Sequence, residues 1–417
     1  MTSVNAVVES RRLESAWTIG SVFLIAALLA FAVASFAPRA LVLDSDYAAF
    51  YGPVARSLIE RGDLAYDNGA LATRYPPGYP LLLAAFYTVT RWFALPDMYA
   101  PIAINVVAAG LSALFLYLTA ALFFGRIAAV VTFALWCSYP VLLPLLASPS
   151  PEPAFLAVLY AAVWMTATGL RSRRSPLFFF AGLLVGAAML IKPIAIGFGL
   201  LLATAAWFWA GPVSLRTRLK LPMLVLLGNA VLVIPWQGLV LWRTGEFILL
   251  STGAVPSIRD GLTFSVHPEK SFQPALPVPE DVSFVERAFL VRYEHLESVG
   301  SIASAVAAEF RDHPTAMCKL FGLKSVRAWY GTDSGRRERV IGPIQAAYLI
   351  VCWMAMISLI RARGESRRLA FSVCVAAGYF WAATVSSLSI VRYMIPVMGF
   401  LFVLAAAHGR RFALRFS

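Results

Sequence analysis

The chain has 417 residues, of which 60% are hydrophobic and only 14% are charged. A soluble domain carries about 25% charged residues, so the composition excludes an ordinary water-soluble protein and predicts an integral membrane protein. The formal net charge of +13 is also typical of nucleic-acid binding. The basic residues, however, form short clusters between apolar runs, as the positive-inside rule describes, so we expect no nucleic-acid partner.

The first apolar run covers residues 17–37 and follows a short basic segment. It is long enough to cross a bilayer and lacks a small-residue cleavage site, so we expect an uncleaved signal anchor. The four cysteines are scattered along the chain and predict neither a metal motif nor a disulfide framework.

A first outer loop is expected over residues 38–97. Its apolar residues recur at helical spacing, which predicts an amphipathic helix on the membrane surface that ends at Gly62. These apolar residues are Tyr47, Phe50, Tyr51, Val54 and Leu58. After the break at Pro76 and Pro77, residues 79–95 form a second apolar run.

The distribution of charge decides whether residues 79–95 cross the membrane. If they did, the basic clusters at residues 171–174, 216–220 and 361–368 would lie outside. If they lie in the outer interface instead, every cluster returns to the cytoplasm. We therefore predict an interfacial helix here, about ten transmembrane helices, and cytoplasmic termini in a plasma membrane, in bacteria the inner membrane. The expected crossings are residues 17–37, 98–124, 127–147, 153–170, 176–191, 193–210, 221–242, 341–360, 369–388 and 393–408.

A second outer loop is expected over residues 243–340. Two sets of apolar residues each share one helical face: Val282, Val285, Phe289, Tyr293 and Leu296, and then Ile302, Val306 and Phe310. The loop is short and poor in strand patterns, so we expect short amphipathic helices rather than a separate enzyme domain. The prediction is a single all-α polytopic membrane domain over residues 1–417.

Ionisable residues then indicate where the chemistry lies. Glu152, Lys192 and Arg392 stand among the apolar runs, at positions that the predicted topology places at outer helix ends. Intramembrane ionisable residues are usually functional. Carboxylates at this face are suited to general-base catalysis or metal binding, and cations to binding an anion such as a lipid phosphate. The other charged residues on this side are Asp44, Asp46, Arg74 and Arg243.

Each of these residues also has a simpler interpretation. Asp44 and Asp46 are typical helix-capping residues, and Glu152 is an acid that the dipole favours at a helix start. Lys192 and Arg392 are able to extend their side chains to the headgroups. The four histidines show no ligand spacing, which disfavours a histidine metal site.

Several segments, taken together and in order, resemble the C-type (GT-C) integral-membrane glycosyltransferases. The resemblance is greatest to the family 39 group, which includes protein O-mannosyltransferases and lipid A aminoarabinose transferases. The segments are the acidic pair with the following PPGYPLLLA, SPSPEPAFLAVLYAA, AGLLVGAAMLIKP, IPWQGLVLWRTGEFILLSTGA, HPTAMCKLFGLKSVRAWYGTDS and VRYMIPVMGFLFVLAAA. Each one alone is a weak signal, but their order makes the case for a GT-C fold.

The resemblance implies a function and roles for the site residues. It implies inverting transfer of a sugar from a polyprenyl-phosphate carrier to an acceptor at the outer face, with Asp46 or Asp44 as general base. Lys192 and Arg392, with Arg74 or Arg243, would neutralise the phosphate. Glu152 would hold the acceptor or a divalent cation (Mg or Mn), for which Asp44 and Asp46 are the other possible ligands.

Two departures from the family pattern leave roles open. The first motif is DSD where many members have a contiguous Asp-Glu, so either aspartate remains a candidate base. The segment WRTGEF replaces an Arg-Asn pair, which weakens the assignment of Arg243. Since no large extra domain follows, we expect a lipid or glycan acceptor, with membrane lipids as the surroundings.

Two alternative functions remain. One is a polytopic transporter or flippase for lipid-linked sugars, although transporters carry ionisable residues near the bilayer midplane and often show repeats. The other is a transferase of the O-antigen-ligase type, for which we expect arginine and histidine rather than an outer aspartate pair.

Overall fold

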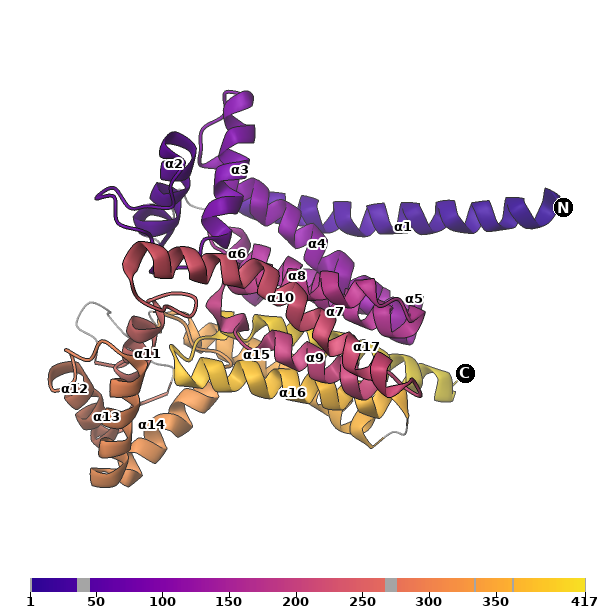
Figure 1. Cartoon of the computed structure of the whole chain (residues 1–417). Coiled ribbons are helices and arrows are strands. Elements are labelled where there is room, and N and C mark those ends of the chain that lie inside the picture. Colours follow the sequence, from indigo (N-terminus) through magenta and orange to yellow (C-terminus); the bar gives the residue numbers. More distant parts are fainter. Residues whose placement is uncertain (1, 36–45, 267–275, 334, 362–363, 417) are drawn as a thin grey trace. The chain divides into compact units, whose positions relative to one another are not determined.

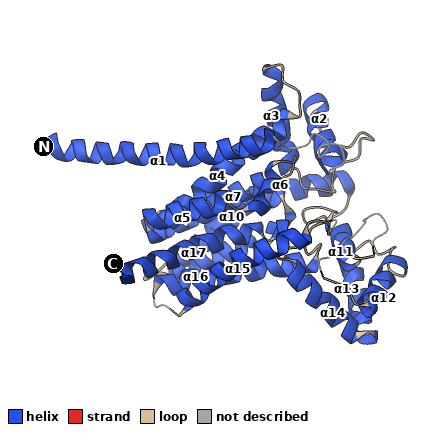
Figure 2. Cartoon of the chain, turned by 180° about the vertical axis from the view of Figure 1, so that it is seen from behind, coloured by secondary structure: helices blue, strands red, loops and turns tan. Residues whose placement is uncertain are grey.

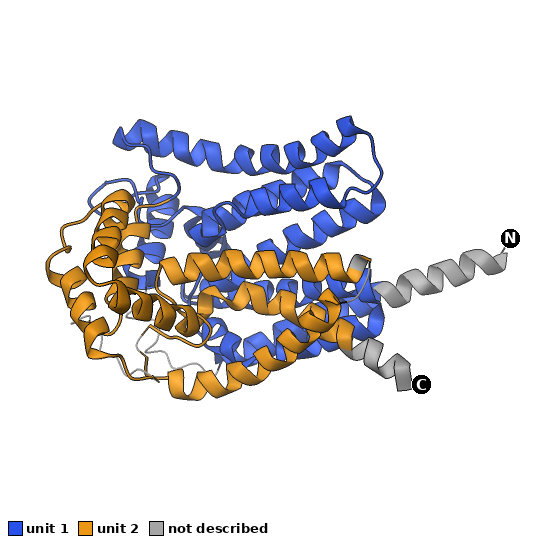
Figure 3. Ribbon diagram, turned by 90° about the horizontal axis from the view of Figure 1, so that it is seen from below, with its two compact units in different colours: residues 1–250, 409–417 blue, residues 251–408 orange. Residues whose placement is uncertain are grey.

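The computed structural model describes residues 2–35, 46–266, 276–333, 335–361 and 364–416. The chain divides into two compact units, Met1–Leu250 with Gly409–Ser417 and Ser251–His408 (Figure 3). The described residues form helices and turns but no strand (Figure 2), apart from one isolated antiparallel bridge between Ala65 and Leu71. The predicted all-α membrane architecture is therefore confirmed, and its organisation as a single domain stays a prediction.

The first unit contains the predicted first outer loop and a bundle of long helices. α4, α7, α8 and α10 lie side by side in that order, and α1 packs against α4 (Figure 1). The elements are α1 (Thr2–Ser35), η2 (Tyr47–Tyr51), α2 (Gly52–Arg61), α3 (Gly78–Trp92), α4 (Tyr99–Phe124), α5 (Arg126–Cys137), η3 (Pro140–Leu142), α6 (Leu143–Leu146), α7 (Glu152–Ser172), α8 (Pro176–Ile191), η4 (Pro193–Ala195), α9 (Phe198–Trp209) and α10 (Leu215–Thr244).

Glycines let α8 and α10 approach each other closely. A Cβ at Gly182 of α8 would lie 2.1 Å from the Val225 carbonyl oxygen, and one at Gly228 of α10 would lie 2.1 Å from that of Phe179. Lipid offers no hydrophobic drive for helix association, so membrane helices rely on such close packing of small residues. The pair α8 and α10 is thus fixed by backbone contact, which also fixes the end of α8 that leads to Lys192.

Helix α3 runs across the end of the bundle rather than along it (Figures 1 and 2). It contacts α2, α4 and α8 and is not among the helices long and apolar enough to span a membrane. Its C-terminal end exposes Trp92 (82%) and Phe93 (71%), the amphipathic and aromatic side chains that gather at membrane interfaces. These features support the interfacial placement that the charge distribution predicts.

Six helices in the described residues are long and apolar enough to cross a membrane. They contain Ala16–Ser35, Tyr99–Phe124, Glu152–Ser172, Leu215–Thr244, Glu338–Ile360 and Ser366–Ser386. Arg126–Cys137 and Pro140–Leu146 make a further span if the pair, bent by 49° next to Pro140, crosses as one. Three shorter apolar helices are Pro176–Ile191, Pro193–Trp209 and Ile395–His408. The count of about ten crossings stays a prediction.

The second unit begins with four short helices around a core of their own. This core contains the predicted apolar faces, since Val282, Val285 and Ile302 are at most 3% exposed. This burial supports the amphipathic pattern predicted for the second loop, although Phe310 of the second face is 36% exposed. The elements are α11 (Ala254–Leu262), α12 (Glu280–Val291), α13 (Val299–Asp312), α14 (Pro314–Arg327), α15 (Glu338–Ile360), α16 (Glu365–Ser386), η5 (Val391–Tyr393) and α17 (Ile395–Phe416).

Candidate active site

Asp46 lies at the start of the first amphipathic helix, and its carboxylate is exposed. The helix begins as a π-helical turn, Tyr47–Tyr51, and the Asp46 side chain makes no capping hydrogen bond to it. The alternative that Asp46 serves only as a helix cap therefore finds no support in the structure. Asp44 lies outside the described residues.

Tyr75 connects Asp46 with Arg74. Burial raises the pKa of the Tyr75 hydroxyl to about 12; the charge of Asp46 adds to the rise, and a hydrogen bond from Arg74 opposes it. The Tyr75 ring packs on Tyr51, with 4.8 Å between the ring centroids. The Asp46 carboxylate and the Arg74 guanidinium thus both interact with the Tyr75 hydroxyl, which places them beside the same aromatic rings.

Arg74 is held by aromatic rings and not by a carboxylate in any ion pair described here. Its guanidinium lies 4.7 Å from the centroid of the Phe50 ring, a cation–π arrangement. The backbone N–H of Arg74 donates to the Tyr66 hydroxyl at 3.3 Å. The Nε atom of Arg74 is buried and has no hydrogen-bond partner in the described structure. This guanidinium is positioned and retains an unused donor, as an anion-binding group requires.

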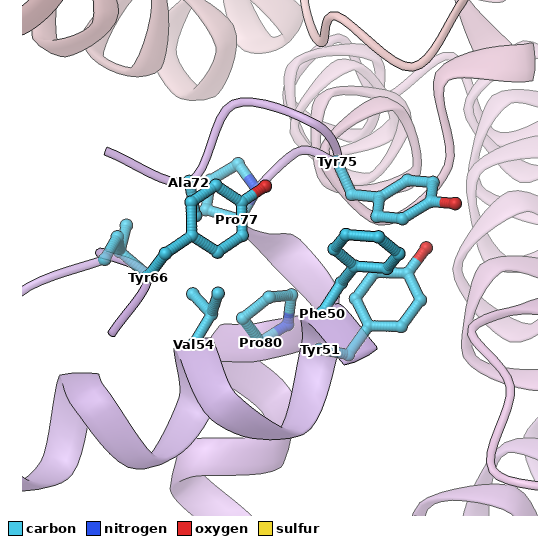
Figure 4. A pocket seen from close by; sticks show the side chains of 9 residues that line it. Phe50, Tyr51, Val54, Tyr66, Ala72, Tyr75, Pro77 and Pro80 are labelled. Atoms are coloured by element: carbon cyan, nitrogen blue, oxygen red, sulfur yellow. The ribbon is translucent and has the colours of Figure 1, made fainter. Parts of the chain in front are cut away.

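An aromatic pocket lies beside Arg74 and Tyr75 (Figure 4). Its empty space, which is open to solvent, is about 260 Å³. The Tyr51 and Tyr75 hydroxyls lie on the side of the pocket opposite Tyr66 and Val54 (Figure 4). The lining residues are Phe50, Tyr51, Val54, Leu64, Tyr66, Ala72, Tyr75, Pro77 and Pro80. This aromatic pocket was not predicted, although Phe50, Tyr51 and Val54 in its lining belong to the predicted apolar face of the first amphipathic helix.

Glu152 and Lys192 form an ion pair at the end of the bundle. Glu152 begins α7 and Lys192 follows α8, and their side chains are only 5% and 11% exposed. The charge of Glu152 also adds to the effect of burial in raising the pKa of the fully buried Tyr79. The sequence predicted that both residues would lie at one membrane face but not that they would bind each other.

Gly78 brings the first loop against this ion pair. A Cβ at Gly78 would lie 2.6 Å from the carbonyl carbon and oxygen of Leu190, two residues before Lys192. Only a glycine allows this contact between the start of α3 and the end of α8. The segment that contains Arg74 and Tyr75 is therefore anchored to the helix end that positions Lys192.

Arg243 is engaged elsewhere in the first unit. Its guanidinium donates to both carboxylate oxygens of Asp63, at 3.3 and 3.0 Å, and this hydrogen bonding is the largest cause that lowers the pKa of Asp63. The two side chains are about one-third exposed. This pair joins α10 to the first loop, so Arg243 has a structural contact in addition to the phosphate role that the sequence predicted.

Arg392 belongs to the second unit. It lies in η5, where its Nη2 atom is 3.5 Å from Asp333 and its guanidinium is 5.4 Å from the centroid of the Tyr393 ring. Its side chain is 30% exposed. Arg392 is thus a cation at the surface of its own unit with an acidic neighbour.

The described residues do not fit a metal site by themselves. No three His, Cys, Asp or Glu residues among them lie close enough together to hold an ion. Glu152 already binds Lys192, and Asp46 faces Tyr75, which also contacts Arg74. The Lys192 ammonium beside Glu152 opposes the binding of a further cation there.

A buried group of charges in the second unit was not predicted from the sequence. Lys324, Arg327 and Glu338 are each at most 4% exposed, although they belong to the predicted second outer loop. The i, i+3 spacing of Lys324 and Arg327 within KLFGLKSVR was the available signal, because it places both on one helical face.

Comparison with known proteins identifies the fold. Residues 74–242 match the family model described as dolichyl-phosphate-mannose-protein mannosyltransferase. The archaeal oligosaccharyltransferase AglB from Archaeoglobus fulgidus, in complex with an inhibitory peptide and a dolichol-phosphate, has a TM-score of 0.53 at 12% identity over 94% of this chain and 50% of AglB. The Archaeoglobus fulgidus oligosaccharyltransferase in complex with Zn and sulfate has a TM-score of 0.56 at 13% identity over 95% and 50%. The chain has the GT-C fold.

ArnT from Cupriavidus metallidurans bound to undecaprenyl phosphate has a TM-score of 0.45 at 15% identity, over 96% of this chain and 79% of ArnT. Among curated proteins, none matches the sequence. The chain spans about half the length of the two oligosaccharyltransferases. The segment that matches the mannosyltransferase model includes Arg74, Glu152 and Lys192 and ends just before Arg243.

Proposed function

We propose that this GT-C protein is a glycosyltransferase that moves a sugar from a polyprenyl-phosphate carrier to a hydroxyl of a lipid or glycan acceptor. The observation that carries the proposal is the group formed by Asp46, Tyr75 and Arg74. An exposed carboxylate and a guanidinium meet at one tyrosine, and Arg74 and Tyr75 are the first two residues of the segment that matches the mannosyltransferase model.

The reaction follows from the chemistry of these groups. Asp46 accepts the proton of the acceptor hydroxyl, and the hydroxyl oxygen forms a bond to the anomeric carbon of the donor sugar. The bond from that carbon to the phosphate oxygen breaks, and its electron pair leaves with the polyprenyl phosphate. Attack from the side opposite the phosphate inverts the anomeric centre. Asp44 remains the alternative base.

Binding of the leaving phosphate is assigned first to Arg74. Its guanidinium is fixed over the Phe50 ring and its buried Nε–H has no hydrogen-bond partner among the described residues, so a phosphate oxygen would supply an acceptor. Preorganised donors of this kind stabilise charge that develops in a transition state. Lys192 and Arg392 are the further proposed cations, and Arg243 would have to exchange Asp63 for phosphate.

Glu152 is proposed to bind the acceptor. Its buried ion pair with Lys192 keeps a carboxylate charged inside the protein, where an unpaired one would be strongly disfavoured. The pair therefore places opposite charges together, one suited to a phosphate and the other to a hydroxyl group.

The experiment uses membranes that contain the full-length protein, with polyprenyl-phosphate sugars as donors and envelope lipids as acceptors. Asp46→Asn and Asp44→Asn are compared with Asp67→Asn, which changes an exposed acid of the same loop. We expect one of the first two variants to lose transfer while Asp67→Asn keeps it. Full transfer by both Asp46→Asn and Asp44→Asn would contradict the general-base proposal. Movement of the lipid-linked sugar across the membrane without covalent transfer would favour the transporter alternative.

The proposed location is the outer face of the plasma membrane. The predicted topology places both termini in the cytoplasm and the candidate site outside, because it returns every basic cluster to the cytoplasm. A reporter that is active only outside the cytoplasm, fused after Arg174, is expected to be inactive. Activity of that fusion would reject the topology.

A further inference from the structure

The turn that precedes Arg392 has an unfavourable backbone conformation. Ser389 is completely buried and has a φ of 53°, in the left-handed region that residues with a Cβ rarely adopt. Its N–H donates to the Thr384 carbonyl oxygen at 2.9 Å. Such conformations persist only where the surrounding structure determines them, and they are frequent at functional sites.

Two basic side chains of α14 bond to carbonyl groups of this turn. The Lys324 amine donates to the carbonyl oxygen of Ser387 and to that of Gly261 in α11, both at 2.8 Å. The Arg327 guanidinium donates to that of Leu388 at 3.1 Å. Because Lys324 and Arg327 lie three residues apart on one helical face, a single helix fixes successive peptide groups of the turn.

Arg327 also ties the turn to the segment between α14 and α15. Its Nε atom donates to the Glu338 carboxylate at 2.9 Å, and the same carboxylate oxygen accepts from the Thr332 N–H at 3.1 Å. The Val391 N–H donates to the Gly331 carbonyl oxygen at 2.8 Å. The bonds of Arg327 to Leu388 and of Val391 to Gly331 therefore cross-link two segments far apart in sequence, and the Arg327–Glu338 pair, with side chains 5% and 1% exposed, holds Arg327 in place.

The two cross-linked segments are the ones that carry Asp333 and Arg392. Asp333 follows Thr332 directly, and Arg392 follows Val391 directly. Their side chains, 55% and 30% exposed, approach to 3.5 Å at the surface of the unit. Buried contacts thus support a partly exposed cation, an arrangement that preorganises a binding group.

We propose that Arg327, through its buried pair with Glu338 and its bonds to the turn, is a positioning residue that preorganises Arg392 for the phosphate of the lipid carrier. The inference rests on the proposed function, in which Arg392 binds that phosphate. Arg327 itself does not touch the carrier. Its effect is to hold the backbone on both sides of the Arg392–Asp333 pair, so that Arg392 does not have to be ordered when phosphate arrives.

The test is a double-mutant cycle on the full-length protein in nanodiscs, with undecaprenyl phosphate as the probe. Arg327→Lys keeps a charge opposite Glu338 but loses the planar set of donors that reaches several carbonyl groups. We expect it to weaken undecaprenyl phosphate binding by about tenfold, as Arg392→Ala does, and to have no further effect when Arg392 is already alanine. Lys319→Met is the matched control, since it breaks an exposed ion pair with Asp281 on the same helix and should leave binding unchanged.

The outcomes distinguish a failure of the proposed Arg392 role from a failure of the proposed Arg327 role. If Arg392→Ala binds undecaprenyl phosphate normally, the proposed role of Arg392 fails. If Arg392→Ala is weakened but Arg327→Lys is normal, or if the two losses simply multiply, the positioning role of Arg327 is overturned. Should Arg327→Lys not fold, Glu338→Gln decides, because it removes the charge opposite Arg327 but keeps a side chain of nearly the same shape. Weaker binding without a lower Tm supports preorganisation of the turn, and unchanged binding rejects it.

Discussion

Charged side chains of the first outer loop are exposed, whereas those around Arg327 and Glu338 in the second unit are buried. In the first loop, Asp46 is exposed and the Asp63–Arg243 pair is about one-third exposed. In the second unit, Arg327 and Glu338 are 5% and 1% exposed, and each bonds to backbone as well as to the other. Exposed charges with few contacts are available to a substrate, whereas buried and saturated charges fix the conformation of the chain. The expected effects of substitution therefore differ in kind between the two regions.

The largest expected effect is on activity, from Asp46→Asn in the first loop. If Asp46 is the base, asparagine lowers transfer by about 10²- to 10⁴-fold because it cannot accept the proton of the acceptor. The side chain is exposed and caps no helix, so Tm should stay within about 1 °C. Rates of sugar transfer in membranes and thermal unfolding in detergent measure the two quantities. A large fall in Tm would show that Asp46 stabilises the fold and would contradict the contrast drawn between the two regions.

The next effect is on stability, from Gly261→Ala in the second unit. A Cβ at Gly261 would lie 1.8 Å from the Ser387 carbonyl oxygen and 2.9 Å from the Lys324 ammonium. Because backbone must move, we expect a loss of about 3 kcal/mol. Gly322→Ala is the matched control, since a Cβ there meets nothing within 4 Å and alanine favours helix. Equal apparent Tm values for the two variants would show that Lys324 and the turn are not rigidly held.

A smaller, pH-dependent effect is expected at Glu286. Burial raises the pKa of this carboxyl from 4.5 to about 7, although the Ser265 hydroxyl and N–H donate to it. The folded state therefore binds this proton more tightly than the unfolded state. Its contribution to stability is complete below about pH 4.5 and is lost as the pH rises through about 7.

The corresponding experiment follows apparent Tm from pH 5 to pH 8. In the parent protein the free energy of unfolding should fall by about 2 kcal/mol over this pH range, and Glu286→Gln should abolish this fall. The stability of the variant relative to the parent protein should be highest above pH 7. Glu297→Gln, at an exposed position, should keep the pH dependence of the parent protein. A Glu286→Gln variant that retains the full decline would contradict the raised pKa.

The smallest expected effect is on stability, from Arg243→Ala. Its pair with Asp63 is partly exposed, and such pairs contribute less than about 1 kcal/mol. Tm should hardly change, and increasing salt should remove what difference there is. A loss of undecaprenyl phosphate binding in this variant would instead show that Arg243 leaves Asp63 to take part in phosphate binding.

Much of the architecture could be predicted from the sequence because the bilayer imposes simple rules. Charge distribution predicted that residues 79–95 would not cross, and α3 runs across the end of the bundle. Apolar periodicity predicted the buried faces that contain Val282 and Ile302. Both signals are local or additive along the chain, so a single sequence contains them.

The pairing of side chains could not be predicted in the same way. The sequence suggested that Glu152, Lys192 and Arg243 lie on one side, but the choice of partner depends on contacts such as Arg243 with Asp63, 180 residues apart. Burial of Lys324 and Arg327 likewise depends on carbonyl groups more than 60 residues away. Nor does periodicity indicate that Tyr75 would lie between Asp46 and Arg74.

The contact of Gly78 with the end of α8 has a consequence for ligand recognition. Two prolines precede Gly78, and Arg74 lies two residues before the first of them. Lys192 directly follows the end of α8 that Gly78 contacts. The stiff prolines and this contact set the distance between the two cations when the chain folds. The backbone positions of Arg74 and Lys192 are therefore set together, and a side chain added at Gly78 would displace one relative to the other.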